Sequence, residues 1–214
     1  MENGILKYLL FALAGYVSGS IMYSYLIPKL FCGVDIVKEG EDHNPGMTNV
    51  MIYCGKPMGL LCLLLDFLKG FIPVYISCGL LDTAHPLFGL VLASPVLGHA
   101  FTPLLRFKGG KAISSAFGSL AAVFQVSSII YGLAFPLIFT TFIMTLKPHS
   151  LCIIIASVTL IITALLTQSS IGIILGTLVI AAVLIYKHAI NRSRAPMSIR
   201  LFMKIPLFEQ KSKE

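Results

Sequence analysis

Three short polar segments interrupt a chain that is otherwise mostly hydrocarbon, and the first spans residues 33–56, GVDIVKEGEDHNPGMTNVMIYCGK. An Asn-Pro-Gly turn with Asn44 and Gly46 lies in its middle, flanked by Asp42, Thr48 and Asn49. Such a density of polar groups and glycines in an apolar chain indicates a segment that folds back into the protein as a site. An ordinary solvated loop is the alternative.

The second segment, RFKGGK at 106–111, could bind an anion. Gly109 and Gly110 stand between Lys108 and Lys111, immediately before a predicted helix. Two glycines without side chains let backbone N–H groups approach a phosphate closely, and the lysines supply positive charge. Basic glycine turns also serve membrane topology, so this motif alone does not identify a site.

The third segment, KHAINR at 187–192, places His188 and Asn191 three residues apart. On a helix that spacing puts both side chains on one face. A surface position is the simpler explanation of this pair alone. Taken together, three charged loops beside hydrocarbon suit a reaction between a lipidic substrate and a water-soluble phosphorylated one.

The elements that must position these segments are membrane helices. The 214 residues are 57% hydrophobic and 12% charged, with a mean hydropathy of +0.89, which excludes an ordinary soluble protein. We therefore expect an all-α, polytopic membrane protein, with one integral-membrane domain at 1–192 and a basic tail at 193–214. The first apolar segment lacks a small-residue cleavage site and is expected to be a retained span.

Seven apolar segments approach the roughly 20 residues needed to cross a bilayer. They lie at about 5–30, 57–79, 87–105, 112–127, 128–146, 150–167 and 170–186. A single helix over 112–146 would be about 50 Å long at about 1.5 Å per residue, well beyond a hydrocarbon core of about 30 Å. Two spans that turn near Ser127 and Ser128 fit better.

The basic residues predict the orientation of these spans. The loops 31–56, 106–111 and 147–149 and the tail contain Lys or Arg, whereas the opposite loops near 80–86, 127–128 and 167–170 contain neither. Basic loops mark the cytoplasmic face and an anionic lipid surface. We expect a cell-membrane protein with its N-terminus outside and its C-terminus and site in the cytoplasm, and we attribute the net charge of +7 to membrane lipids and not to nucleic acid.

A few polar residues fall inside the apolar segments. Asp66 and Lys69 lie three apart on one helical face, where they can form an ion pair that is either structural or catalytic. His99 is either a packing histidine or part of a site. The five cysteines have no CxxC or CxxH spacing, so we predict free thiols and no metal site.

The order and spacing of several motifs resemble one family through nearly the whole chain: the acyl-phosphate-dependent glycerol-3-phosphate acyltransferases of the PlsY type. The motifs are SGSIMYSYLI at 18–27, GVDI at 33–36, NPGMTNV at 44–50, GK at 55–56, LLDFLKGFIP at 64–73, GHAF at 98–101, FKGGK at 107–111 and H-x-x-N at 188–191.

The resemblance implies a seven-helix bundle that transfers a fatty acyl group from acyl phosphate to the sn-1 hydroxyl of glycerol-3-phosphate. The product would be lysophosphatidic acid, and neither a metal, a cofactor nor acyl-CoA would be required. Lys111, His188 and Asn191 match the family's functional lysine, histidine and asparagine. The FKGGK segment would hold phosphate, and either His188 or a substrate phosphate would take the hydroxyl proton.

Four positions depart from the family pattern. Asp42 and His43 stand where a Ser-Gly pair is usual, Ile52 stands where an arginine grips phosphate, and Ala112 replaces a glycine. One alternative is therefore a paralogue with another acceptor, whose hydroxyl or amine Asp42 would contact. A non-enzymatic lipid-binding or transport protein is the second alternative. The tail either lies on the membrane as a basic amphipathic segment or is solvated.

Overall fold

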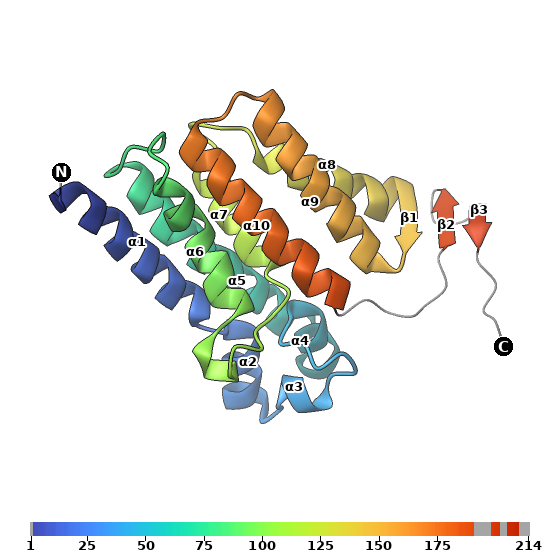
Figure 1. Cartoon of the computed structure of the whole chain (residues 1–214). Coiled ribbons are helices and arrows are strands. Elements are labelled where there is room, and N and C mark those ends of the chain that lie inside the picture. The colour runs from blue at the N-terminus through green and yellow to red at the C-terminus, as the bar shows by residue number, and fades with distance from the viewer. Residues whose placement is uncertain (1, 191–197, 202–204, 210–214) are drawn as a thin grey trace.

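The computed structural model describes residues 2–190, 198–201 and 205–209, and these are mostly helical (Figure 1). Within these residues, five stretches are long and apolar enough to cross a membrane, and they agree closely with five of the predicted spans. The first is Gly4–Cys32, which includes most of α1 (Glu2–Ser20), α2 (Tyr23–Ile27) and the π-helix Pro28–Cys32. The third is Phe88–Leu105, which contains α6 (Phe88–Ala100) and the short helix Pro103–Leu105. The other three are α5 (Lys56–Cys78), α9 (His149–Leu166) and α10 (Ile171–Ile190).

The predicted spans 112–127 and 128–146 are two separate and shorter helices. They are α7 (Ile113–Ala122) and α8 (Ile130–Ile138), the latter continued by a π-helix at Phe139–Ile143. The chain turns between them, where the Ser127 amide donates to the Val123 carbonyl at 2.9 Å. A single long helix over this region is therefore excluded. The polar segment 33–56 adds two more short helices, α3 (Ile36–Glu39) and α4 (Met47–Cys54).

Helix α6 lies at the centre of the bundle and packs against α1, α5, α7 and α10. Two glycines allow α1 and α6 to approach closely, because a Cβ on Gly98 would overlap the Tyr16 carbonyl oxygen and a Cβ on Gly19 would overlap the Pro95 carbonyl oxygen. Small residues at helix contacts are typical of membrane proteins, where close van der Waals packing takes the place of the hydrophobic effect.

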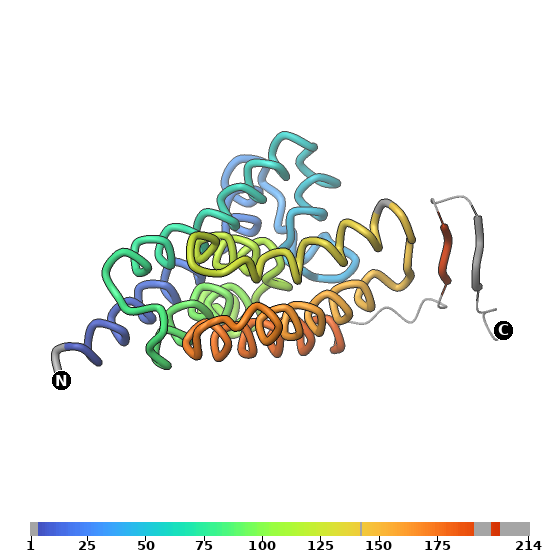
Figure 2. The backbone as a smooth tube through the Cα atoms, turned by 90° about the horizontal axis from the view of Figure 1, so that it is seen from above, coloured from blue at the N-terminus to red at the C-terminus, as the bar shows by residue number. Residues whose placement is uncertain are grey.

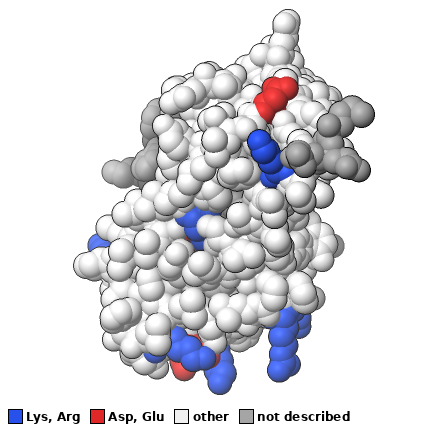
Figure 3. Space-filling view, turned by 90° about the vertical axis from the view of Figure 1, so that its left-hand side faces the viewer, with Lys and Arg blue, Asp and Glu red and all other residues white. Residues whose placement is uncertain are grey.

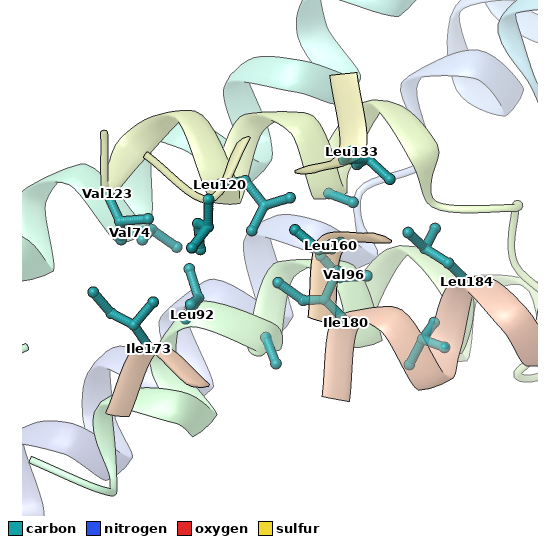
Figure 4. Packing of buried hydrophobic residues seen from close by; sticks show 14 of the residues in the cluster. Val74, Leu92, Val96, Leu120, Val123, Leu133, Leu160, Ile173, Ile180 and Leu184 are labelled. Atoms are coloured by element: carbon teal, nitrogen blue, oxygen red, sulfur yellow. The ribbon is translucent and has the colours of Figure 1, made fainter. Parts of the chain in front are cut away.

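Helices α5 and α7 pack in the same way. A Cβ on Gly70 would overlap the Ser115 carbonyl oxygen, and a Cβ on Gly118 would overlap the Phe67 carbonyl oxygen. Between these contacts, aliphatic side chains of α5 to α10 point toward one another and fill the interior (Figure 4). The outer faces remain apolar: Leu13, Leu64 and Ile162 are about half exposed, as expected of side chains that meet lipid.

The loops gather at two opposite ends of the bundle. At one end, the Tyr8 hydroxyl donates to the Asp82 carbonyl at 3.0 Å and the hydroxyls of Ser127 and Ser169 lie 2.7 Å apart. At the other end lie the polar segment 33–56, the turn 106–111 and the start of α9. Figure 3 shows that most Lys and Arg side chains of the α1 side gather at its lower end, where α2, α3 and α4 lie in Figure 1.

The expectation of a wholly helical chain is wrong at one small antiparallel sheet. Strand β1 (Met144–Lys147) pairs with β2 (Ser198–Leu201), which pairs with β3 (Ile205–Glu209). Leu146 pairs with Ile199 and Lys147 with Ser198, so apolar residues meet apolar ones and polar residues meet polar ones. Strands β1 and β2 lie beyond the ends of α8 and α9 (Figure 1 and Figure 2). The described part of the tail is therefore paired strand, which neither prediction for the tail included.

The close α5–α7 contact predicts that Gly118→Val destabilises the protein, because the added methyl groups would overlap backbone of α5. We expect the thermal unfolding midpoint of the purified protein in detergent to fall by about 5–10 °C. Gly4→Ala is the matched control, because a Cβ there meets nothing within 4 Å. Equal midpoints for the two variants would contradict this packing.

Candidate active site

A cavity of about 860 Å³ opens at the end of the bundle that carries the polar segments. Its wall is formed by the segment 42–49 together with α5, α7, α8, α9 and α10. The structure brings most of the predicted site residues to this one wall: Asp42, Asn44, Gly46, Thr48, Asn49, Lys111 and His188. The first polar segment is therefore folded against the helices and is not a free loop.

Asp42 is the centre of a hydrogen-bonded cluster at the mouth of the cavity. Its Oδ2 lies 2.8 Å from the Lys111 Nζ, and its Oδ1 accepts from the Asn49 Nδ2 at 2.8 Å. The Asn44 backbone N–H donates to the same Oδ1 at 3.2 Å. Residues 69 positions apart in the sequence are thus joined by an ion pair.

The turn that precedes α4 is built by short local hydrogen bonds. The Asn49 Nδ2 also donates to the Asn44 carbonyl at 2.9 Å, so one amide ties the start of the helix to the turn. A Cβ on Gly46 would lie 2.5 Å from the Asn44 Nδ2, so a side chain there would require the Asn44 amide to move. His43 has a φ of 49°, a left-handed conformation that histidine adopts more readily than most residues, at a position where the resemblance implies a glycine.

The cluster also sets the protonation of Asp42. Partial burial alone would raise the pKa of its carboxyl, but hydrogen bonds from Lys111 and Asn49 and the positive charge of Lys111 outweigh that effect. The pKa is therefore held below its usual range, and the carboxylate is ionised at neutral pH.

The two glycines of the 106–111 turn do not present their amides to an anion. The Gly109 amide donates to the Ala100 carbonyl at 3.1 Å, and the Gly110 amide donates to the His99 carbonyl at 3.2 Å. A Cβ on either glycine would overlap His99, so they allow the turn to pack on the end of α6. The expected role of these amides in holding phosphate is not supported by this geometry. Lys108 is exposed and, unlike Lys111, does not line the cavity.

His188 is buried, with 3% of its surface exposed, and lines the cavity. Its Nδ1 lies 2.8 Å from the Leu184 carbonyl oxygen. A carbonyl oxygen only accepts, so Nδ1 carries the proton and Nε2 is the nitrogen that can accept one. Asn191, the predicted partner on the same face, lies outside the described residues.

The neighbouring Lys187 connects α10 to the 106–111 turn and to the end of α6. Its Nζ donates to the Gly109 carbonyl at 2.8 Å and to the Ala100 carbonyl at 3.1 Å, and it lies 5.5 Å from the centre of the Phe101 ring. These contacts fix His188 relative to Lys111. From the sequence, Lys187 was only one of many basic residues near the tail, because no spacing marks a lysine that caps another helix.

The predicted Asp66–Lys69 ion pair is present at 2.8 Å and is buried. The Lys69 Nζ also donates to the Ile21 carbonyl at 2.6 Å, at the break between α1 and α2, where that carbonyl has no partner within the helix. The Ser24 hydroxyl donates to the Asp66 Oδ2 at 2.6 Å. The pair therefore stabilises a broken helix, while Asp66 and His99 also face the cavity.

Several cavity residues escaped the sequence analysis. They are Ser114 at the start of α7 and Pro148, His149 and Ser150 at the start of α9. None belongs to a spaced motif, and the loop 147–149 was marked only by its lysine, so only the fold reveals these residues. Ile52 and Ala112 are placed differently from each other. Ile52 is 68% exposed on α4. Ala112 is buried on the cavity wall with a φ of 61°, a conformation that favours the glycine implied by the resemblance.

The remainder of the wall is hydrocarbon. Its apolar side chains are Leu60, Leu63, Leu64, Phe67, Ile113, Phe117, Leu137 and Ile153. Leu60 and Leu64 are also about half exposed on the outer face of α5, so the cavity reaches the lipid-facing surface. The arrangement can hold an anionic group at Lys111 and Asn49, a hydroxyl at His188 and an alkyl chain along α5 and α7.

Comparison with known proteins agrees with this chemistry. A family model described as glycerol-3-phosphate acyltransferase matches residues 9–196. A protein named glycerol-3-phosphate acyltransferase from Endomicrobium trichonymphae is 33% identical over 204 residues, which cover 92% of this chain and 98% of that protein. Glycerol-3-phosphate acyltransferase 2 from Thermotoga maritima is 37% identical over 187 residues, which cover 86% of this chain and 91% of that protein.

Two solved structures share the fold. Both are crystal structures of PlsY (YgiH), described as an integral membrane glycerol 3-phosphate acyltransferase, and both are 31% identical to this chain. The glycerol 3-phosphate form has a TM-score of 0.75, with 86% of this chain and 90% of that chain covered. The lysophosphatidic acid form has a TM-score of 0.73, with 86% and 89% covered.

The buried ion pair predicts that Lys69→Met lowers the free energy of unfolding by far more than the loss of one contact would. The substitution leaves the Asp66 carboxylate without its lysine and the Ile21 carbonyl without its donor. Breaking such a pair costs about 3–5 kcal/mol, which corresponds to a fall of about 10 °C in the unfolding midpoint. The double variant Asp66→Asn/Lys69→Met removes both charges and should recover part of that loss. A double variant as unstable as the sum of the single variants would contradict the pairing.

Proposed function

The chain belongs to the glycerol-3-phosphate acyltransferase family, and we propose that it transfers a fatty acyl group from acyl phosphate to the sn-1 hydroxyl of glycerol-3-phosphate. The products are lysophosphatidic acid and phosphate, so the protein is a membrane acyltransferase of phospholipid synthesis. The reaction takes place in the cavity at the polar end of the bundle.

The observation that carries this proposal is the two-sided wall of that cavity. One side places Lys111, Asn49 and His188 together, and the other is lined by Leu64, Phe67 and further apolar side chains. A substrate with an acyl chain and a phosphate needs both surfaces within one space. The lipid-facing position of Leu60 and Leu64 gives the acyl chain a route from the membrane.

The proposed chemistry needs little beyond orientation and charge stabilisation, because an acyl phosphate is a mixed anhydride with a good leaving group. The acceptor oxygen bonds to the acyl carbon while the bond from that carbon to the phosphate oxygen breaks. The electron pair leaves with the phosphate, whose charge Lys111 stabilises. The hydroxyl proton passes to the His188 Nε2 and from there to the departing phosphate.

The sidedness is also a proposal. We infer seven crossings, with α7 and α8 as two short ones. The start of α7 and the start of α9 both lie at the cavity, whereas Ser127 in the turn between α7 and α8 contacts Ser169 at the opposite end of the bundle. The end that carries the cavity holds the basic loops, and such loops are retained in the cytoplasm. The N-terminus is then outside, and the active site faces the cytoplasm of the cell membrane.

The direct test supplies purified protein with acyl phosphate and glycerol-3-phosphate and measures phosphate release and lysophosphatidic acid together. We expect one phosphate released for each lysophosphatidic acid formed. Acyl-CoA as donor and glycerol as acceptor are run in parallel. Turnover with acyl-CoA but not with acyl phosphate would overturn the proposed donor. Turnover with glycerol but not with glycerol-3-phosphate would overturn the proposed acceptor.

A matched pair of lysines tests the site. Lys111→Met removes a charge that lines the cavity, whereas Lys108→Met removes one that is exposed three residues away. We expect kcat/KM to fall by about 10²–10³ for Lys111→Met, the range typical of a lost charge stabiliser, and by less than about threefold for Lys108→Met. Similar losses for both variants would contradict the placement of the anion at Lys111.

The histidine is tested separately. His188→Gln keeps the size of the side chain and a hydrogen-bonding group but cannot take up a proton at neutral pH. We expect kcat to fall by about 10²–10⁴, as for loss of a general base, with a smaller change in KM. An unchanged kcat would show that the proton goes elsewhere, for example directly to the substrate phosphate.

A further inference from the structure

We propose that the Asp42 carboxylate is a tethered anion that occupies the phosphate subsite at Lys111. It must be displaced before a phosphate can bind there. The proposal rests on the function given above and extends it to the control of phosphate affinity. It makes Asp42 a residue that sets specificity, although the resemblance had suggested a serine at that position.

The first argument is geometric. Three donors converge on one carboxylate: the Lys111 Nζ, the Asn49 Nδ2 and the Asn44 backbone N–H, at 2.8, 2.8 and 3.2 Å. All three residues line the cavity. A positive charge, a side-chain amide and a backbone N–H are the groups that bind phosphate oxygens in proteins. The structure thus holds a formed oxyanion site with a carboxylate in it.

The second argument is charge. Among the described residues that line the cavity, Lys111 is the only lysine or arginine. Its pairing with Asp42 neutralises the positive charge that a phosphate would need. A phosphate beside an ionised Asp42 would also meet a like charge at close range, which is unfavourable. The carboxylate and the phosphate therefore compete for the same donors.

The third argument is that the Asp42 carboxylate can move out of the phosphate subsite. Its side chain is 46% exposed, and that of Lys111 is 26% exposed, so both carboxylate and ammonium lie at the mouth of the cavity and not in its apolar interior. Asp42 precedes a residue with a left-handed backbone in a turn outside the helices. Rotation of the carboxylate into water would open the three donors without unfolding a helix.

Displacement has a consequence for the catalytic cycle. When a phosphate leaves, the carboxylate returns to Lys111. The lysine is then paired with an anion again between turnovers, and its donors are not left open. Asp42 weakens substrate binding but speeds the release of phosphate-bearing products.

The test measures binding of inorganic phosphate to the full-length protein in lipid nanodiscs by calorimetry, without acyl donor. Asp42→Asn and Asp42→Ser should each lower the dissociation constant by about tenfold, a modest effect for removal of a like charge a few ångströms from a dianion in a solvated site. Glu41→Gln is the matched control: it removes the same charge one residue away, outside the cavity wall, and should change the constant by less than about twofold.

Two outcomes would overturn the proposal. Unchanged or weaker phosphate binding in both Asp42 variants would show that the carboxylate does not compete. A gain that persists when Lys111→Met is added to Asp42→Asn would place the phosphate elsewhere. Because binding is measured without turnover, failure of acyl transfer would remove the proposed function and leave this result intact.

Discussion

The ammonium of Lys69 shows the constraint on which the fold depends: a polar group enclosed by hydrocarbon must find its partner inside the protein. The first span breaks at residues 21–22, and Lys69 from α5 caps the freed Ile21 carbonyl. Asp66 balances the charge, and Ser24 from beyond the break binds Asp66. The break redirects the chain into α2 and the polar segment. An ion pair buried in one helix thus fixes where another segment enters the site.

The same principle explains the glycines at the helix contacts. With lipid outside and alkyl side chains inside, burial alone does not favour one helix arrangement over another. Backbone-to-backbone approach at Gly19 and Gly98, and at Gly70 and Gly118, supplies the specificity instead. The tight α1–α6 and α5–α7 contacts bring His99 and Asp66 to the floor of the cavity and leave its mouth to the polar segments. Structural and catalytic polar groups are therefore neighbours.

The sequence predicted the spans and the convergence of the polar segments well, because both depend on features that residues carry individually. Hydropathy located the long helices, and the resemblance selected Lys111 and His188, which the fold brings to one wall.

The sequence did not reveal roles that depend on tertiary partners. The sequence around Gly109 and Gly110 predicted a turn whose amides bind an anion. Those amides instead donate to carbonyl oxygens at the end of α6. Lys187 and His149 had no local signal, and β1 and β2 are too short for an alternating pattern to be recognised. The pairing of Asp42 with Lys111 joins residues that no sequence rule connects.

The central claim is that one cavity holds both the phosphate and the acyl chain of the lipid. The most direct measurement is an experimental structure of this protein with acyl phosphate bound in the absence of glycerol-3-phosphate. The account predicts the phosphate within hydrogen-bonding distance of the Lys111 Nζ and the Asn49 Nδ2, with Asp42 turned away and the acyl chain along Leu64, Phe67 and Phe117. A lipid phosphate away from Lys111, or an acyl chain outside this cavity, would contradict it.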